Sequence, residues 1–105
     1  MIKIFTDAKR LKPGLFSIGF VSACGNYSAF KIIDSTSDEA EKISLKYAIE
    51  CMEKMLDVTI FYTDSESAAR EYNGYLQHPL YRPAVVNKIE REKNIANTWL
   101  RSLGG

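Results

Sequence analysis

Two short segments, far apart in the sequence, have nearly the same form. Residues 3–8 read Lys-Ile-Phe-Thr-Asp-Ala, and residues 59–65 read Thr-Ile-Phe-Tyr-Thr-Asp-Ser. Both are rich in Ile, Phe and Thr, which is typical of buried strands, and in both we expect the strand to end at Thr-Asp. If the two strands are parallel neighbours, Asp7 and Asp64 lie side by side at their carboxyl ends, where open α/β sheets bind ligands.

This pair of acids has two interpretations. Asp often caps a helix or starts a turn, so each residue taken alone needs no further role. Two carboxylates held close together repel each other, however, and a divalent cation between them is the commonest reason for such a pair. The segments alone leave both interpretations open.

The bulk properties predict one ordinary globular domain spanning residues 1–105. Hydrophobic residues make up 46% and charged residues 26% of the chain, and the net charge of +1 gives no global argument for nucleic-acid binding. We expect no signal sequence and no membrane span, because no apolar run approaches the roughly 20 residues that a span needs. Cys24 and Cys51 lack metal-site spacing, so we expect a cytoplasmic protein with buried, inert thiols.

The order of elements predicts an α/β fold with a mixed five-stranded sheet and helices against its faces. Strands are expected at 2–7, 15–24, 27–33, 56–63 and 84–90. One helix is expected to begin within residues 35–39, and two more are expected at 65–72 and 94–103. Residues 75–83, which include His78, are expected to form a loop. The predicted order is therefore β-β-β-α-β-α-β-α, in which a hairpin precedes the helical crossovers.

Two helices have apolar faces that we expect to be buried. In the first helix, with Ser35 or Ser37 as N-cap, this set is Ala40, Ile43, Tyr47, Ala48, Cys51, Met52 and Met55. In the last helix it is Ile95, Trp99, Leu100 and Leu103. Glu41 directly follows Ala40, the first residue of the apolar face of the first helix, so we expect its side chain to point along the edge of the sheet.

The glycines exclude the common nucleotide-binding motifs. Gly14, Gly19 and Gly25 do not form Gly-x-Gly-x-x-Gly, and no Gly-Lys-Ser/Thr phosphate loop is present. We therefore expect no nucleotide cofactor.

Five segments, in this order, resemble motifs of the ribonuclease H family, in particular the ribonuclease HI-type domains also found beside reverse transcriptases. They are Ile-Phe-Thr-Asp-Ala at 4–8, Pro-Gly and Gly-Phe-Val at 13–14 and 19–21, Ala-Glu at 40–41 followed by Leu45 and Ala48-Ile49, Tyr-Thr-Asp-Ser at 62–65, and Arg-Glu-Lys-Asn at 91–94. The resemblance spans nearly the whole chain.

The resemblance implies an endonuclease that cleaves the RNA strand of an RNA–DNA hybrid with two Mg²⁺ or Mn²⁺ ions. The matching positions imply that Asp7, Glu41 and Asp64 are catalytic residues and metal ligands. Three carboxylates suit Mg²⁺, which prefers hard oxygen donors. Two ions activate water on one side of the phosphate and stabilise the leaving oxygen on the other, so no nucleophilic side chain is required.

The chain departs from the family pattern at the last helix. The family usually has a fourth acid there, at the position of Thr98, or of Asn97 if one residue is deleted. Asn97 has a carbonyl oxygen that makes it a weaker candidate ligand. This departure supports an alternative, a ribonuclease H-like module with weak or no catalysis that binds nucleic acid or a protein partner. Resolvases and integrases share the fold, so a nuclease with another substrate is a third interpretation.

Basic residues near the acids are candidates for contact with nucleic-acid phosphates. The basic candidates are Lys9, Arg10 and Lys12, which follow Asp7, and Arg91, which precedes the last helix. Ser65, directly after Asp64, is a fifth candidate for such a contact. The alternative is that the basic residues are solvated charges on loops. Nothing in the sequence indicates an oligomeric state.

Overall fold

A computed structural model describes residues 1–75 and 84–104 of the chain. The strands are β1 (Ile2–Lys12), β2 (Leu15–Ser22), β3 (Ser28–Asp34), β4 (Thr59–Thr63) and β5 (Val85–Lys88). The helices are α1 (Ser37–Cys51), α2 (Glu66–Tyr75) and α3 (Ile95–Gly104), with short 3-10 helices η1 (Glu53–Val58) and η2 (Arg91–Lys93).

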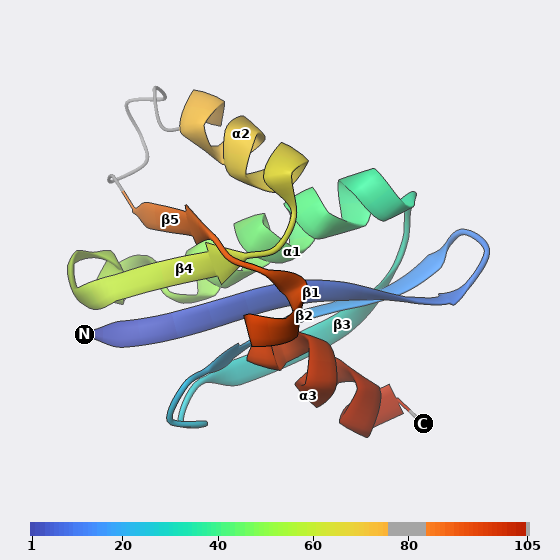
Figure 1. The fold of residues 1–105 in the computed structure, drawn as a ribbon, viewed down its shortest axis with the longest axis horizontal. Helices are drawn as coiled ribbons and strands as arrows, with labels where there is room; N and C mark the ends of the chain where they lie inside the picture. The colour runs from blue at the N-terminus through green and yellow to red at the C-terminus, as the bar shows by residue number, and fades with distance from the viewer. Residues whose placement is uncertain (76–83, 105) are drawn as a thin grey trace.

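The five strands form one mixed sheet in the order β3-β2-β1-β4-β5. The pairs β1–β2 and β2–β3 are antiparallel, and the pairs β1–β4 and β4–β5 are parallel. Helices α1 and α2 lie on one face of the sheet and α3 lies on the other (Figure 1). The predicted fold class is confirmed, including the parallel neighbours β1 and β4.

Strand β1 is longer than the predicted segment 2–7 and has a different partner on each side. It pairs in parallel with β4 from Ile2 to Phe5, and it remains paired with β2 as far as Lys12. The prediction ended the strand too early because residues 9–12 are mostly charged, and in a two-stranded arm such residues can point to solvent. Gly14 closes this arm with φ +81°, a conformation that favours glycine.

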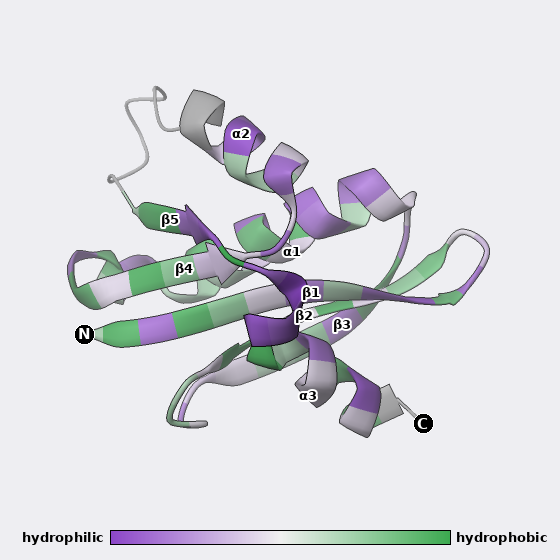
Figure 2. Cartoon of the chain, in the orientation of Figure 1, coloured by the Kyte–Doolittle hydropathy of each residue, from purple (hydrophilic) through white to green (hydrophobic). Residues whose placement is uncertain are grey.

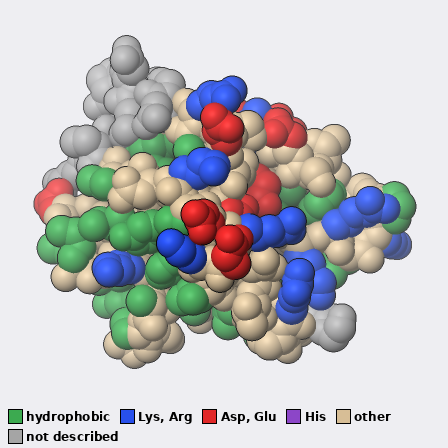
Figure 3. Space-filling view, viewed as in Figure 1, with side chains coloured by type: hydrophobic (Ala, Val, Ile, Leu, Met, Phe, Trp, Pro, Cys, Tyr) green, Lys and Arg blue, Asp and Glu red, His purple; other side chains and the backbone are tan. Residues whose placement is uncertain are grey.

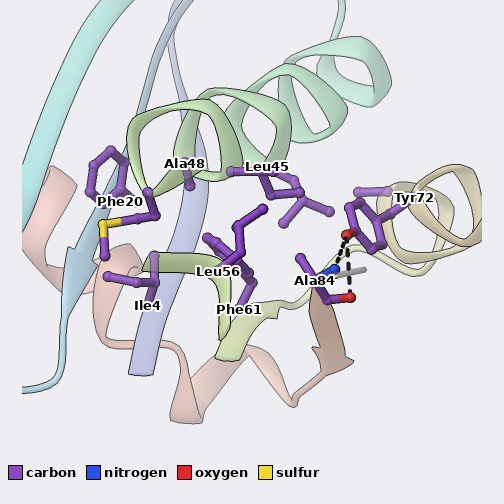
Figure 4. Close-up of a cluster of buried hydrophobic side chains, with 11 residues drawn as sticks. Ile4, Phe20, Leu45, Ala48, Leu56, Phe61, Tyr72 and Ala84 are labelled. Atoms are coloured by element: carbon purple, nitrogen blue, oxygen red, sulfur yellow. Dashed lines mark hydrogen bonds between the residues drawn. The ribbon is translucent and has the colours of Figure 1, made fainter. Parts of the chain in front are cut away.

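The main hydrophobic core lies between the sheet and the helices α1 and α2 (Figure 4). Ile4 of β1 and Phe61 of β4 are fully buried at its centre. The alternation of hydrophobic and hydrophilic residues along the start of β1 is visible in Figure 2. At the edge of this core the hydroxyl group of Tyr72 donates to the carbonyl of Ala84 at 3.2 Å and accepts from the amide of Ala84 at 3.1 Å. This pair of bonds ties α2 to the residue that precedes β5.

The buried face of α1 agrees only in part with the predicted apolar set: Ala40, Ala48 and Met52 are buried as predicted, but Cys51 is not. Its buried residues are Ala40, Ser44, Leu45, Ala48 and Ile49. Thr36, rather than Ser35 or Ser37, is the N-cap, and its hydroxyl accepts from the amide of Glu39. The helix is rotated so that Leu45 and Ile49 face the core. Cys51 is therefore exposed, as is Cys24, and the prediction of buried thiols is wrong.

Two other elements differ from the prediction in detail. Strand β4 begins at Thr59 rather than at residue 56, because residues 53–58 form η1 with Leu56 buried. In α3 the buried apolar residues are Ala96 and Leu100, whereas the predicted Ile95 and Leu103 are exposed.

The boundaries around the predicted loop at 75–83 also shift. Helix α2 continues through Tyr75, although the sequence favoured an end near residue 72. The rest of the predicted loop, with His78, lies outside the described residues. Strand β5 is shorter than the predicted 84–90.

Within residues 1–75 and 84–104 no helix has the length and apolar character needed to cross a membrane.

Candidate metal centre

The parallel pairing of β1 and β4 places two acids next to each other. The last parallel pair is Phe5 with Tyr62, and two residues further along each strand come Asp7 and Asp64. Asp64 directly follows the end of β4, as predicted. Asp7, by contrast, lies inside β1 rather than at its end, opposite Gly19 of β2. The predicted proximity therefore arises where the parallel pairing stops, not where β1 stops.

Gly19 itself is required by a close approach between strands. A Cβ atom built at Gly19 would lie 2.6 Å from the carbonyl oxygen of Ala29 and 2.9 Å from the Cβ of Phe30. Any larger residue would push β3 away from β2. Glycine at this position therefore allows β3 to pack closely against β2, at the residue that lies opposite Asp7 on β2.

The third acid, Glu41, comes from the first turns of α1. Ala40 is fully buried against the sheet, and Glu41 is next to it at the edge of the buried face. One carboxylate oxygen from each of Asp7, Glu41 and Asp64 lies within 4.8 Å of the others. The structure thus brings together all three predicted metal ligands, from β1, α1 and the end of β4. We call this set the acid cluster.

Burial and electrostatic repulsion raise the pKa of two members of the acid cluster, Asp7 and Glu41. Burial, and then the charges of Asp7 and Asp64, raise the pKa of Glu41 to about 9. Burial, and then the charge of Asp64, raise the pKa of Asp7 to about 6. The positive charge of Arg91 acts in the opposite direction on the pKa of both groups. Without a cation, the cluster at neutral pH therefore keeps a proton on Glu41.

The residues of the cluster fit a hard divalent cation. Among the described residues, Oε2 of Glu41 is buried and has no hydrogen-bond partner. A buried carboxylate oxygen left in this state is costly unless a cation binds it. Three carboxylates within 4.8 Å match the oxygen donors that Mg²⁺ and Mn²⁺ prefer. Because the ligands must be ionised, cation binding would release the proton held by Glu41.

Helix α3 reaches the acid cluster through an amide. Asn94, immediately before α3, donates from Nδ2 to the carbonyl of Thr6 at 2.9 Å and to Oδ2 of Asp64 at 3.1 Å. Its Oδ1 accepts from the amide of Ala96 at 3.1 Å and so caps the helix. From the sequence, Asn94 was predicted only as part of the motif at residues 91–94. The available signal was an Asn at the first position of the predicted helix 94–103, because Asn is a common N-cap.

The predicted fourth-ligand positions lie further along α3. Asn97 is half-buried in the first turn, and Thr98 is exposed. Helix α3 contains no Asp or Glu. Asn97 as a weaker ligand remains a prediction.

The residues predicted to contact nucleic acid differ in exposure and in location. Lys9 is half-buried and Arg10 and Lys12 are exposed, all on the arm of β1 beyond Asp7. Figure 3 shows Lys and Arg side chains gathered toward the tip of the β1–β2 hairpin. Arg91 is exposed in η2, and its charge acts on the acid cluster.

Ser65 has a structural role in this structure. Its hydroxyl oxygen accepts from the amide of Ala68 at 3.2 Å, at the start of α2, and lies 3.2 Å from the hydroxyl of Ser67. A contact of Ser65 with nucleic acid remains a prediction.

Comparisons with known proteins identify the fold. No protein-family model matches the chain, and no curated protein matches it in sequence. Among solved structures it is similar to RNase H1 from the halophilic archaeon Halobacterium salinarum NRC-1, with a TM-score of 0.68 and 17% identity over 90% of this chain and 89% of the other. It is also similar to the N-terminal RNase H domain of Rv2228c from Mycobacterium tuberculosis, solved as a fusion with maltose binding protein. That match has a TM-score of 0.68 and 16% identity, and covers 98% of each chain. The resemblance inferred from the motifs is therefore confirmed for the fold: the chain is a ribonuclease H-fold domain.

Proposed function

We propose that the protein is a metal-dependent endoribonuclease that hydrolyses the RNA strand of RNA–DNA hybrids. One observation carries this proposal: Asp7, Glu41 and Asp64 converge within 4.8 Å on a ribonuclease H fold. The same three positions carry the acids of the family motifs that the sequence resembles.

The three carboxylates would hold Mg²⁺ or Mn²⁺. When bound, two such ions supply an activated water and stabilise the leaving 3′-oxygen. Glu41 would have to release its proton to bind a cation, and Asp7 and Asp64 would supply further carboxylate oxygens from β1 and from the end of β4. No side chain is needed as a nucleophile in this mechanism.

The basic residues around the cluster would bind the substrate backbone. The positive charge of Arg91 interacts with the carboxyl groups of Asp7 and Glu41. Lys9 follows Asp7 by two residues on the same strand. Such contacts fix the position of a duplex without reading its sequence, and a hybrid is distinguished by its shape and 2′-hydroxyl groups.

One observation favours a second candidate function. Helix α3 supplies no carboxylate, so the cluster has three acids where the resembled family usually has four. A site with less negative charge holds its cations more weakly. The second candidate is therefore a module that binds nucleic acid or a protein partner with little or no cleavage.

Cleavage of a labelled RNA–DNA hybrid tests the proposal. The hybrid is incubated with the protein in Mg²⁺ and then in Mn²⁺, beside double-stranded RNA, double-stranded DNA and single strands. We expect cleavage of the RNA strand of the hybrid alone. Asp64→Asn should abolish it, because the variant loses a charged ligand and keeps the fold.

A matched variant controls for loss of charge. Asp34→Asn removes one exposed carboxylate at the end of β3, outside the acid cluster, and should cleave like the wild type. Normal cleavage by Asp64→Asn would rule out the assigned site. No cleavage by the wild type in either metal would favour the binding module, and cleavage of DNA would indicate a different nuclease.

A further inference from the structure

Asn94 joins three parts of the structure at one buried position. Asn94 is only 2% exposed. Its side chain forms hydrogen bonds to β1, to Asp64 directly after β4, and to α3. Both Nδ2 bonds and the Oδ1 bond lie between 2.9 and 3.1 Å. The amide group thus has partners for its donor nitrogen and for its acceptor oxygen.

The backbone of Asn94 is held as firmly as its side chain. Its amide donates to the carbonyl of Arg91 at 3.1 Å, and its carbonyl accepts from the amide of Asn97 at 3.1 Å. Just upstream, the amide of Ile89 donates to the carbonyl of Thr63 at 2.9 Å, which holds the connection against the end of β4. Asn94 therefore has little freedom to move away from Asp64.

We propose that Asn94 is a positioning residue of the metal centre, whose amide holds the Asp64 carboxylate in place to bind the cation. The inference rests on the proposed function only in that the acid cluster binds a divalent cation. Through this residue, α3 contributes an orienting donor to the centre instead of a carboxylate.

The chemistry of the amide suits this role. A donor on Oδ2 of Asp64 fixes the rotation of the carboxylate and leaves Oδ1 for a cation. The amide is neutral, so it neither competes with the cation for Asp64, as a lysine would, nor adds repulsion, as a carboxylate would. The other Nδ2 proton bonds to the carbonyl of Thr6 in β1. The same amide therefore fixes the position of the Asp64 carboxylate relative to β1, the strand that carries Asp7.

The positioning role is separable from the capping role. Capping uses Oδ1, which accepts from Ala96, whereas positioning uses Nδ2, which donates to Asp64. Ser and Thr are good N-caps but lack the reach and the second donor of Asn. Asn94→Ser and Asn94→Thr therefore keep a cap and lose the bond to Asp64.

Mn²⁺ binding measured by isothermal titration calorimetry tests the inference on the intact chain. Removing a partner that orients a metal ligand typically lowers affinity by about 10- to 100-fold. We expect the Mn²⁺ dissociation constant of Asn94→Ser and Asn94→Thr to rise at least about tenfold. Urea unfolding of the same samples reports how much each variant weakens the docking of α3.

Leu100→Ala is the matched control for that weakening. Leu100 is 1% exposed in the same helix and is apolar, so its truncation loosens α3 without touching Asp64. We expect it to lower the urea midpoint but to leave the Mn²⁺ dissociation constant within about twofold of wild type. Equal loss of affinity in Leu100→Ala, or wild-type affinity in both Asn94 variants, would overturn the inference.

Wild-type protein provides a measurement that needs no variant. In two-dimensional NMR, the side-chain amide signals of Asn94 should shift on Mg²⁺ addition, with the same saturation as the backbone amide of Asp64. The side-chain amide of Asn26, in the turn between β2 and β3, should not shift. If the Asn94 side-chain signals stay unchanged while the Asp64 signal shifts to saturation, the positioning role of Asn94 is wrong but the cation site is not. Absence of any Mg²⁺ or Mn²⁺ binding would overturn the proposed function as well.

Discussion

At the scale of single residues, Glu41 shows the cost of gathering three acids in one place. Its carboxyl group is largely withdrawn from water and faces the charges of Asp7 and Asp64, which raise its pKa to about 9. An ordinary Glu, with a pKa of 4.5, is ionised at neutral pH. The folded protein without a cation therefore binds a proton that the unfolded chain does not bind.

This proton predicts how stability depends on pH. Between pH 4.5 and about 9 the folded state alone holds the proton on Glu41, so the free energy of unfolding falls as pH rises. One such proton corresponds to at most about 1.4 kcal/mol per pH unit. Glu41→Gln cannot ionise and should flatten this decline. Urea unfolding at pH 5, 7 and 9 in the presence of a chelator measures the effect.

An exposed glutamate on the same helix serves as the control. Glu50→Gln removes a carboxylate that lies 4.0 Å from Lys46 and far from the cluster along α1. Its pH profile should run parallel to that of the wild type. A parallel profile for Glu41→Gln would show that Glu41 does not hold the proton.

Sequence and structure agree best for the acids and least for the groups that orient them. Asp7 and Asp64 were predictable because two similar strand segments carry the same Thr-Asp dipeptide, and the parallel pairing of β1 with β4 brings the two acids close together. Glu41 came from the family resemblance and from its phase relative to the apolar stripe. The role of Asn94 was not predictable, because a bond between residues 30 positions apart depends on how α3 docks, and no local pattern records it.

At the scale of elements, α3 contributes no carboxylate to the centre. It begins at Ile95, so position 98 lies in its first turns, four residues after Asn94. Thr98 is exposed there, so a longer acidic side chain can be accommodated. Position 98, where the resembled family usually has its fourth acid, is therefore the place at which we test restoring a negative charge.

We predict that Thr98→Asp strengthens Mn²⁺ binding. A unit charge about 8 Å from a divalent ion in water contributes about 1 kcal/mol, which corresponds to about fivefold in affinity. Calorimetric titration of the variant measures the change. Ser102→Asp places the same charge one turn further along α3 and should change the affinity less. Equal gains in both variants would indicate a general charge effect rather than a position beside the cluster.

The boundaries of elements were harder to predict than their order. All five strands and three helices appear in the predicted order, because hydrophobic runs and turn residues mark them locally. The end of β1 was missed because a charged two-stranded arm has no hydrophobic signature. The face of α1 was missed because its apolar residues cover two overlapping stripes, and only packing against the sheet selects Leu45 and Ile49 over Cys51.

At the scale of the whole molecule, the centre joins segments from across the chain. Its residues come from β1, α1, the end of β4 and the start of α3, so only the complete fold brings them together. A cation that binds this arrangement binds the folded state and not the unfolded chain. By mass action it must then stabilise the whole domain.

We predict that Mg²⁺ and Mn²⁺ raise the melting temperature. At a cation concentration 100 times the dissociation constant, linkage contributes about 2.7 kcal/mol. For a domain of this size, that amounts to an increase of roughly 10 °C. Differential scanning calorimetry measures it, with NaCl at matched ionic strength as control. Asp7→Asn should lose the increase, and an equal increase in NaCl would show that the cation acts only by screening.

The two partners of β1 also bear on how the chain is made. The hairpin of β1 and β2, followed by β3, contains only antiparallel neighbours and can pair as soon as residues 2–34 have emerged from a ribosome. Strand β4 is synthesised later, so for that interval the inner edge of β1 carries unpaired backbone groups from Ile2 to Phe5. An open edge of this kind is a template for strands of other chains. This edge of β1 therefore stays open to pairing with other chains during translation, until the residues of β4 are available to cover it.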